Sequence, residues 1–217
     1  MNIPALAVET VSLAASFVIY SQKPAVPYLR FFPAFLFITV VVEIIASQLT
    51  ANRINTGPYY SYFTAFEFEF YLFTISLIIV RKGMKKLIYL VMVIYPLATI
   101  YNINFGQRDT FASITFAVGC LLIVAGSIYY FLELFQFPKA VNLLKEPAFW
   151  ICSSLLFFYC CTFPLIGMFN YVRKVSPVIM LHLNFILTYL NVLLYSLFTI
   201  AFLCKIKIRR PVSQIPA

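Results

Sequence analysis

The sequence predicts an all-α, polytopic integral membrane protein that folds as one bundle of seven transmembrane helices. Of its 217 residues, 63% are hydrophobic and 11% are charged, whereas a soluble domain has roughly 45–50% apolar and about 25% charged residues. Seven helices of about 20 apolar residues each would use about 140 positions, which is close to the hydrophobic content. No polar stretch approaches the roughly 50 residues of a soluble domain, so we expect no appended catalytic, nucleotide-binding or DNA-binding domain.

Apolar runs separated by short polar segments mark the expected spans. The first run contains Glu9 and lacks the basic start of a cleavable signal peptide, so we expect it to remain as the first helix. In chain order the separators are SQKPAVPYLR, TANRINTGPYY, RKGMKK, NINFGQRD, FPKAVNLLKE and NYVRKVSP. The predicted spans cover residues 4–20, 31–49, 60–80, 87–103, 110–132, 148–169 and 177–204, and residues 205–217 form a short basic cytoplasmic tail.

The basic residues predict the orientation, because Lys and Arg resist export and stay in cytoplasmic loops. With the N-terminus outside, twelve of the sixteen Lys and Arg residues fall on the inner side. The four outer ones are Arg53, Arg108, Arg173 and Lys174. We therefore expect an N-out/C-in protein of the cytoplasmic (inner) membrane of a bacterium. The net charge of +9 then reflects cytoplasmic loops, and no nucleic-acid partner is expected.

Ionisable groups inside the predicted spans are candidates for a binding site, because such groups are costly in a bilayer. At about 1.5 Å of rise per residue, Glu9, Glu43, Glu67 and His182 share one layer roughly 8 to 10 Å below the outer surface. They predict an outward-facing polar pocket for a small polar or cationic ligand. The predicted ligand-binding residues are Glu67, Glu43, Glu9, Tyr71, His182, Asn184 and Asn191.

Helical periodicity selects among these candidates. In the 60–80 span, one polar stripe runs through Tyr60, Thr64, Glu67, Tyr71 and Thr74. Glu69 lies about 200° around that helix from Glu67, since each residue turns about 100°, so the two carboxylates cannot share a face. In the 177–204 span, a second stripe runs through Asn184, Thr188, Asn191, Tyr195 and Thr199, with His182 off it. Alternatively, these polar groups only hydrogen-bond between helices.

We expect no enzyme, because no catalytic constellation is recognisable. Ser153 and Ser154 lie toward the cytoplasmic end of their span, whereas His182 lies toward the outer end of the next. One histidine cannot supply a histidine-rich zinc site, although Glu43, Glu67 and His182 make a conceivable three-ligand set. The five cysteines show no C-x-x-C spacing and are expected to be small buried side chains. No metal and no cofactor are predicted.

Two stretches carry a family resemblance. NLLKEPAFWICSSLLFFYCCTFPLIG, with its Glu-Pro-x-Phe-Trp start at Glu146 to Trp150, and NFILTYLNVLLYSLFTIAFLCK resemble the seven-helix membrane sensor modules of some bacterial two-component histidine kinases and related free-standing membrane proteins. The resemblance implies a ligand-sensing or receptor-like input module. This chain carries no kinase domain, so a signal is expected to reach a separate cytoplasmic or membrane partner. Proton- or cation-coupled transport and a structural membrane scaffold remain alternative interpretations.

Overall fold

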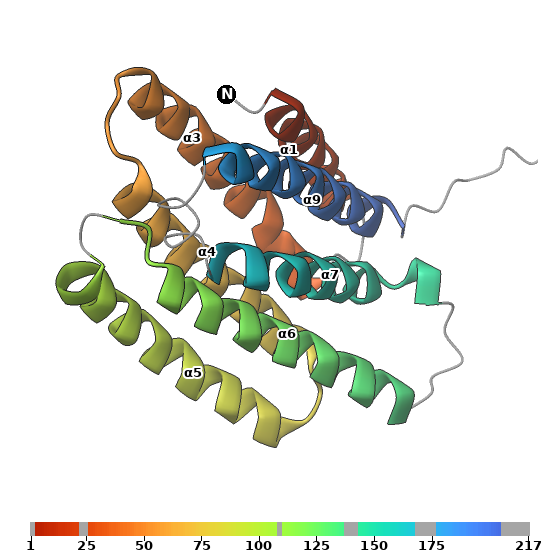
Figure 1. Cartoon of the computed structure of the whole chain (residues 1–217). Coiled ribbons are helices and arrows are strands. Elements are labelled where there is room, and N and C mark those ends of the chain that lie inside the picture. The colour runs from red at the N-terminus through yellow and green to blue at the C-terminus, as the bar shows by residue number, and fades with distance from the viewer. Residues whose placement is uncertain (1–2, 22–25, 108–109, 137–142, 168–176, 205–217) are drawn as a thin grey trace, which may run out of the picture.

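Every regular element of the protein is a helix (Figure 1). A computed structural model describes residues 3–21, 26–107, 110–136, 143–167 and 177–204, and no strand occurs among them. The all-α prediction is therefore confirmed for this part of the chain. The predicted tail at 205–217 lies outside the described residues, as do the basic positions Lys23, Arg108, Lys139, Arg173 and Lys174.

A helix occupies each of the seven ranges that the apolar runs mark. The long helices are α1 (Ile3–Ser16), α3 (Phe32–Ala51), α4 (Gly57–Ile78), α5 (Lys82–Tyr101), α6 (Ser113–Gln136), α7 (Pro147–Gly167) and α9 (Pro177–Leu203). Short elements flank them, namely α2 (Val18–Ser21), the 3-10 turns Pro27–Phe31 and Leu143–Lys145, and the π-helical turn Asn102–Gly106.

The first predicted span is interrupted, in contrast to the expectation of one helix over 4–20. Regular helix stops after Ser16 and resumes at Val18. The Ser16 hydroxyl donates a hydrogen bond to the Leu13 carbonyl at 2.6 Å, and such side-chain bonds compete with the backbone ladder and bend helices. The break shortens α1 to 14 residues.

Prolines explain where several helices begin. Pro33 and Pro58 occupy the first turn of α3 and α4, and Pro147 opens α7. Proline lacks the amide N–H that would be unsatisfied in a first turn, and its fixed φ already suits the helix. Pro96 and Pro164 lie inside α5 and α7 instead, where each removes one backbone hydrogen bond.

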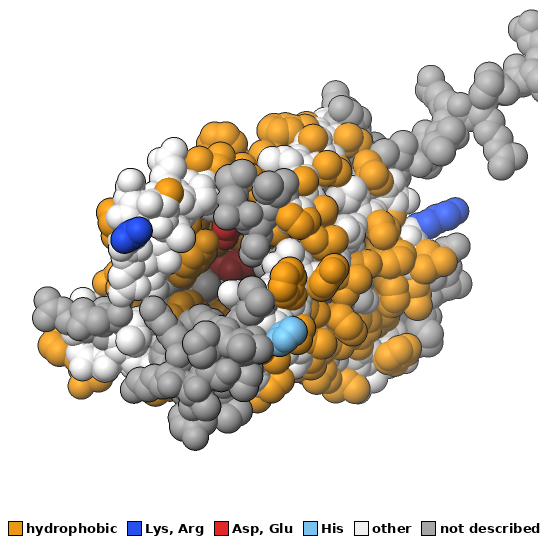
Figure 2. Space-filling view, turned by 45° about the horizontal axis from the view of Figure 1, so that its top comes forward, with side chains coloured by type: hydrophobic (Ala, Val, Ile, Leu, Met, Phe, Trp, Pro, Cys, Tyr) orange, Lys and Arg blue, Asp and Glu red, His pale blue; other side chains and the backbone are white. Residues whose placement is uncertain are grey.

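Five segments of the described chain are long and apolar enough to cross a membrane, by length and composition. They are Pro27–Ala51, Lys82–Gly106, Ser113–Gln136, Pro147–Ile166 and His182–Leu203. The α1–α2 region is apolar but shorter, and α4, which has 22 residues, carries two glutamates and several hydroxyl groups. Large apolar side chains also cover much of the surface (Figure 2), which suits contact with lipid. The chain thus has multi-pass membrane character.

Helices that follow one another in the chain run in alternating directions (Figure 1). α9 lies between α1 and α7, α6 packs on α7 and α4, and α5 packs on α4. The core is rich in aromatic rings, with Phe32 in edge contact with Phe198 and Phe202 at centroid distances of 5.5 and 5.4 Å. Phe35 stacks on Phe70 at 3.9 Å. This aromatic core joins α3, α4 and α9.

Alternating direction gives the bundle two distinct ends. At one end, α3 finishes and α1, α4 and α6 begin; we call it the hollow end. Arg53 lies there, in the left-handed conformation with φ of 58° that closes α3. The opposite end, which we call the basic end, carries the other described basic residues, Arg30, Arg81, Lys82, Lys85, Lys86 and Lys145.

One carboxylate fastens the α4–α5 connection at the basic end. Glu133 of α6 is buried and accepts hydrogen bonds from the backbone N–H groups of Val80 and Arg81, both at 2.8 Å. These amides precede α5, whose first turn has no side-chain cap of its own. The negative charge also complements the positive end of the α5 dipole. Glu133 thus ties the connection to α6.

Candidate functional site

Three carboxylates from three helices converge near the hollow end. Glu9 of α1 interacts electrostatically with Glu43 of α3 and Glu67 of α4, and Glu67 also interacts with Glu43. Figure 2 shows acidic side chains at the floor of a hollow in the molecular surface. We call Glu9, Glu43 and Glu67 the carboxylate cluster. The structure therefore brings together all three glutamates of the predicted pocket.

The sequence places Glu9 on the inner face of α1. Ala5, Glu9, Ser12, Ser16 and Ile19 recur at helical spacing, and all five are buried. Small neighbours on this face let α1 approach α9 and α3 closely, as is common between membrane helices. Only 4% of Glu9 is exposed, so its carboxylate is held inside the bundle.

Tyrosine hydroxyls satisfy two of the three carboxylates. Tyr60 donates a hydrogen bond to Glu43 Oε2 at 3.1 Å, and Tyr71 donates to Glu67 Oε1 at 3.0 Å. Each pair fixes the rotamer of its glutamate. Tyr71 is fully buried, so the prediction that it belongs to the same site as Glu67 agrees with the geometry.

Two further polar groups of the site are buried. Glu9 Oε2 has no hydrogen-bond partner among the described residues, and the Tyr159 hydroxyl of α7 lies against the Glu67 carboxylate. A buried polar atom without a partner costs about 1–3 kcal/mol, so Glu9 Oε2 has unused capacity for a ligand.

The cluster has no balancing positive charge among the described residues. The groups that influence Glu9, Glu43 and Glu67 are each other and tyrosine hydroxyls, with no lysine, arginine or histidine. Buried carboxylates without a counter-charge are strongly disfavoured in an apolar environment. Within the described part of the chain, bound protons or a bound cation would therefore have to balance the cluster.

The cluster is not arranged as a metal site. Within the described ranges, no group of three His, Cys, Asp or Glu side chains is spaced to hold one metal ion. His182, the third ligand of the conceivable zinc set, is exposed on α9.

The polar residues predicted on the last helix lie apart from the cluster. The side chains of His182 and Asn184 are exposed and Asn191 is half-buried. Tyr195 of the same stripe is buried and interacts with all three cluster carboxylates. The α9 contribution thus comes one to three turns deeper than the sequence suggested.

Sequence reasoning missed three tyrosines of the site. Tyr60 and Tyr195 stood on the two polar stripes, so periodicity could have selected them. Tyr159 lies in the apolar run FFYCC of α7, where no stripe distinguishes it. Its position beside Glu67 and its contact with Tyr71, at a ring-centroid distance of 6.0 Å, show that it belongs to the site.

Glu69 faces away from the cluster, as its angular position on α4 requires. It interacts electrostatically with Tyr95 of α5, and its Oε1 atom is buried without a partner within the described residues. The two glutamates of the FEFEF segment therefore serve different helix interfaces. Glu69 is a matched control position for Glu67.

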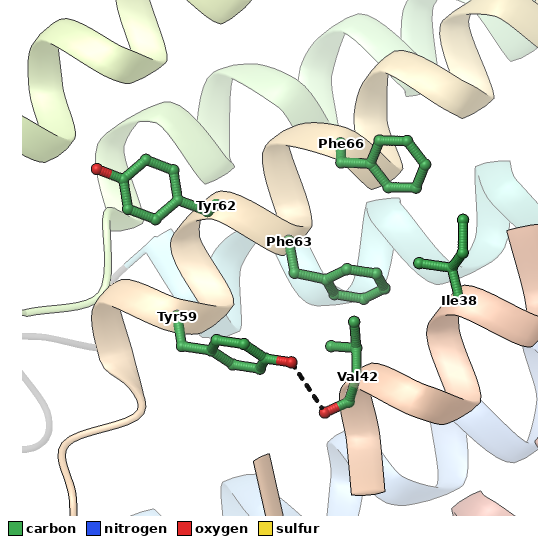
Figure 3. Close-up of a pocket in the computed structure, with 6 residues that line it drawn as sticks. All are labelled: Ile38, Val42, Tyr59, Tyr62, Phe63 and Phe66. Carbon is green, nitrogen blue, oxygen red and sulfur yellow. Dashed lines mark hydrogen bonds between the residues drawn. The ribbon is translucent and has the colours of Figure 1, made fainter. Parts of the chain in front are cut away.

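A pocket of about 380 Å³ lies between α3 and α4 (Figure 3). Its lining, which we call the aromatic groove, consists of Ile38, Val42, Tyr59, Tyr62, Phe63 and Phe66. The two helices pack loosely against each other here. Phe63 of α4 points toward Val42 and Ile38 of α3, whereas the Tyr62 ring points away from them (Figure 3).

Comparisons with known proteins assign no family. The chain matches no protein-family model, no curated protein and no solved structure. The function therefore has to be inferred from the geometry of the carboxylate cluster.

Proposed function

We propose that this chain is a receptor-like, seven-helix membrane protein whose carboxylate cluster binds a small organic cation from the outer side. The observation that carries the proposal is the convergence of Glu9, Glu43 and Glu67 from three helices, together with the hollow in the surface that has acidic side chains at its floor (Figure 2). The unpartnered Glu9 Oε2 atom offers a further acceptor. An ammonium ion supplies both the missing charge and hydrogen-bond donors.

The proposed orientation is N-out/C-in, in the cytoplasmic membrane. It rests on the twelve of sixteen basic residues that this arrangement keeps inside. Six of those twelve are the described residues of the basic end. The hollow end then faces outward, toward an extracellular ligand. In this proposal α1 and α4 cross the membrane together with the five more apolar segments.

Signal transmission is proposed to run along α4. This helix carries Glu67 toward the hollow end, and the connection that follows it is tied to α6 through Glu133. A cation that draws α1, α3 and α4 together favours one arrangement of α4 over another, and a ligand shifts such an equilibrium by its difference in affinity for the two states. The basic segment at Arg81–Lys86 then presents differently to a cytoplasmic or membrane partner.

Thermal unfolding of the detergent-purified protein tests cation binding. The probe is tetramethylammonium chloride, with sodium chloride at equal ionic strength as the control. A ligand that binds only the folded state stabilises it by about 2.7 kcal/mol at 100 times Kd. We expect a saturable rise of Tm with tetramethylammonium that Glu67→Gln abolishes and the matched variant Glu69→Gln retains.

The same experiment identifies the outcomes that contradict the proposal. An equal rise of Tm with sodium chloride, or an unchanged rise of Tm in Glu67→Gln, would show that the cluster is not the binding site. If cluster variants alter stability alone and no cation raises Tm, the scaffold interpretation holds. Cation uptake into proteoliposomes that Glu67→Gln abolishes would instead indicate a transporter.

A further inference from the structure

The aromatic groove opens on the outer surface of the helix bundle. Of its lining residues, Tyr62 is 50% exposed, Phe66 45% and Ile38 40%. In the proposed topology this surface lies within the membrane and faces lipid. The groove is thus a hydrocarbon-lined recess that a molecule dissolved in the bilayer reaches directly.

The groove and the carboxylate cluster lie side by side on the same pair of helices. The Tyr59 hydroxyl donates a hydrogen bond to the Val42 carbonyl at 3.4 Å (Figure 3), and the next residue, Tyr60, donates to Glu43 at 3.1 Å. Consecutive residues of α4 therefore bond consecutive residues of α3. The first bond bounds the groove and the second belongs to the cluster.

The same adjacency recurs one turn deeper along α4. Phe66 lines the groove, and its neighbour Glu67 belongs to the cluster. The volume of about 380 Å³ falls within the range of about 300–1,000 Å³ that is usual for small-molecule pockets. Groove and cluster therefore draw on adjacent residues of α4 at two successive levels of the helix.

We propose that the ligand is an amphiphilic cation, whose ammonium group binds the carboxylate cluster and whose hydrocarbon chain lies in the aromatic groove. This inference rests on the proposed function of the cluster. The charge of the cluster selects an ammonium head, and the apolar lining selects the chain. The faces of Tyr59 and Phe63 further attract a cation that passes between the helices.

Charge distinguishes this ligand from ordinary membrane lipid. A phospholipid chain fits the groove, but its phosphate is repelled by three carboxylates that have no basic partner among the described residues. A single-chain amine suits both sites, because its ammonium group pairs with the carboxylate cluster and its chain fills the aromatic groove. For its head to reach Glu43, the Tyr59–Val42 bond has to open, and at 3.4 Å it is longer than the usual hydrogen bond and costs little to break.

A chain-length series tests the proposal separately from the function of the cluster. The probes are tetramethylammonium and butyl-, hexyl- and octyltrimethylammonium, with binding to the purified protein measured by calorimetry. The variants are wild type, Ile38→Trp and Val42→Phe, which fill the groove, and Leu97→Trp, which adds the same bulk at an exposed position of α5. Because detergent also takes up longer chains, the relevant quantity is the ratio of wild-type to variant affinity at each length.

We expect this ratio to be about one for tetramethylammonium and to rise by about two- to fourfold per pair of methylenes for the groove-filled variants. Full burial of each methylene is worth about 0.8 kcal/mol, or about fourfold, and the half-exposed groove gives less. Leu97→Trp should follow wild type at every length. A photoreactive alkylammonium should label residues 59–66 of the wild-type protein, which requires no variant to fold.

Each contrary result has a distinct meaning. A ratio of one at every chain length, or labelling confined to other segments, overturns the groove assignment while tetramethylammonium binding upholds the cluster. Long chains that bind Glu67→Gln as well as wild type show a site for hydrocarbon alone and overturn the amphiphilic ligand. No binding of any ammonium ion overturns the proposed function itself.

Discussion

Tyr71 and Glu67 act as a pair one helical turn apart on α4. The Tyr71 side chain is fully buried, so its hydroxyl has no water to replace the 3.0 Å bond to Glu67. We expect Tyr71→Phe to lower the free energy of unfolding by about 1–2 kcal/mol, measured by denaturant unfolding in detergent. Tyr62→Phe, which alters an exposed tyrosine of the same helix, is the control and should change it little.

A double-mutant cycle separates this bond from the packing of the ring. If the two side chains stabilise each other, Tyr71→Phe should cost less in a Glu67→Met background, which offers no oxygen acceptor, than in wild type, with a coupling energy above about 0.5 kcal/mol. Strictly additive effects would show that the hydrogen bond contributes nothing to the folded state.

Gly119 permits the closest approach between α6 and its neighbours. A Cβ atom at this position would lie 2.6 Å from Phe68 Cδ2 and 2.7 Å from the Tyr95 hydroxyl. We expect Gly119→Ala to destabilise the protein by about 1–3 kcal/mol through overpacking. The matched change Gly83→Ala meets nothing within 4 Å and should be neutral or stabilising, since alanine favours helix over glycine. Equal Tm values for the two variants would refute the tight contact.

Angular position was predictable from sequence for α4, but contacts between helices were not. A rotation of about 100° per residue separates Glu67 from Glu69, and the structure directs them toward different neighbours. Tyr159 gave no comparable signal, because a single polar group within an apolar helix acquires its meaning only from the helices around it. The depth shared by Glu9, Glu43 and Glu67 was readable because short loops keep successive helices antiparallel.

At the scale of elements, the connection between α4 and α5 depends on a residue of α6. Glu133 accepts hydrogen bonds from two backbone N–H groups of that connection, next to the basic residues at the start of α5. We expect Glu133→Gln to cost about 2 kcal/mol of unfolding free energy, because the amide keeps one acceptor and turns an NH₂ group toward the second N–H.

A neighbouring variant controls for the polar character of this region. Gln136 accepts a hydrogen bond from the Arg81 guanidinium at 2.8 Å on the exposed surface. Gln136→Ala should change stability by less than about 0.5 kcal/mol. If both variants unfold at the same denaturant concentration, the two buried hydrogen bonds to Glu133 contribute no more to stability than the exposed hydrogen bond to Gln136.

Helix limits were predicted less well than helix positions. α5 begins at Lys82, five residues before the predicted span at 87, and α4 begins at Gly57 rather than at 60. Hydropathy marks the apolar part of a helix, whereas the backbone ladder continues through charged residues such as Lys85 and Lys86. The break after Ser16 was missed for a different reason, since a single serine hydroxyl is invisible to an average over about 19 residues.

At the scale of the whole molecule, the proposed orientation makes a direct prediction. A green fluorescent protein fused after Ala217 should fluoresce, because it folds in the cytoplasm, whereas alkaline phosphatase fused there should be inactive. The reverse pattern is expected for fusions in the α3–α4 connection near Arg53. Fluorescence at both sites would mean that an even number of helices crosses the membrane between them, contrary to seven spans.

The aromatic core has a consequence for permeation. Phe32, Phe198 and Phe202 are fully buried on the basic-end side of the carboxylate cluster, and the Phe35–Phe70 stack closes the same level. The packed rings of these described residues leave no continuous row of water molecules between them. A hydrated ion or a proton that reaches the glutamates therefore has to leave on the side from which it entered. A planar bilayer that contains the protein should therefore carry no ionic current through it when a voltage is applied. The cluster then exchanges ions and protons with one side of the membrane alone.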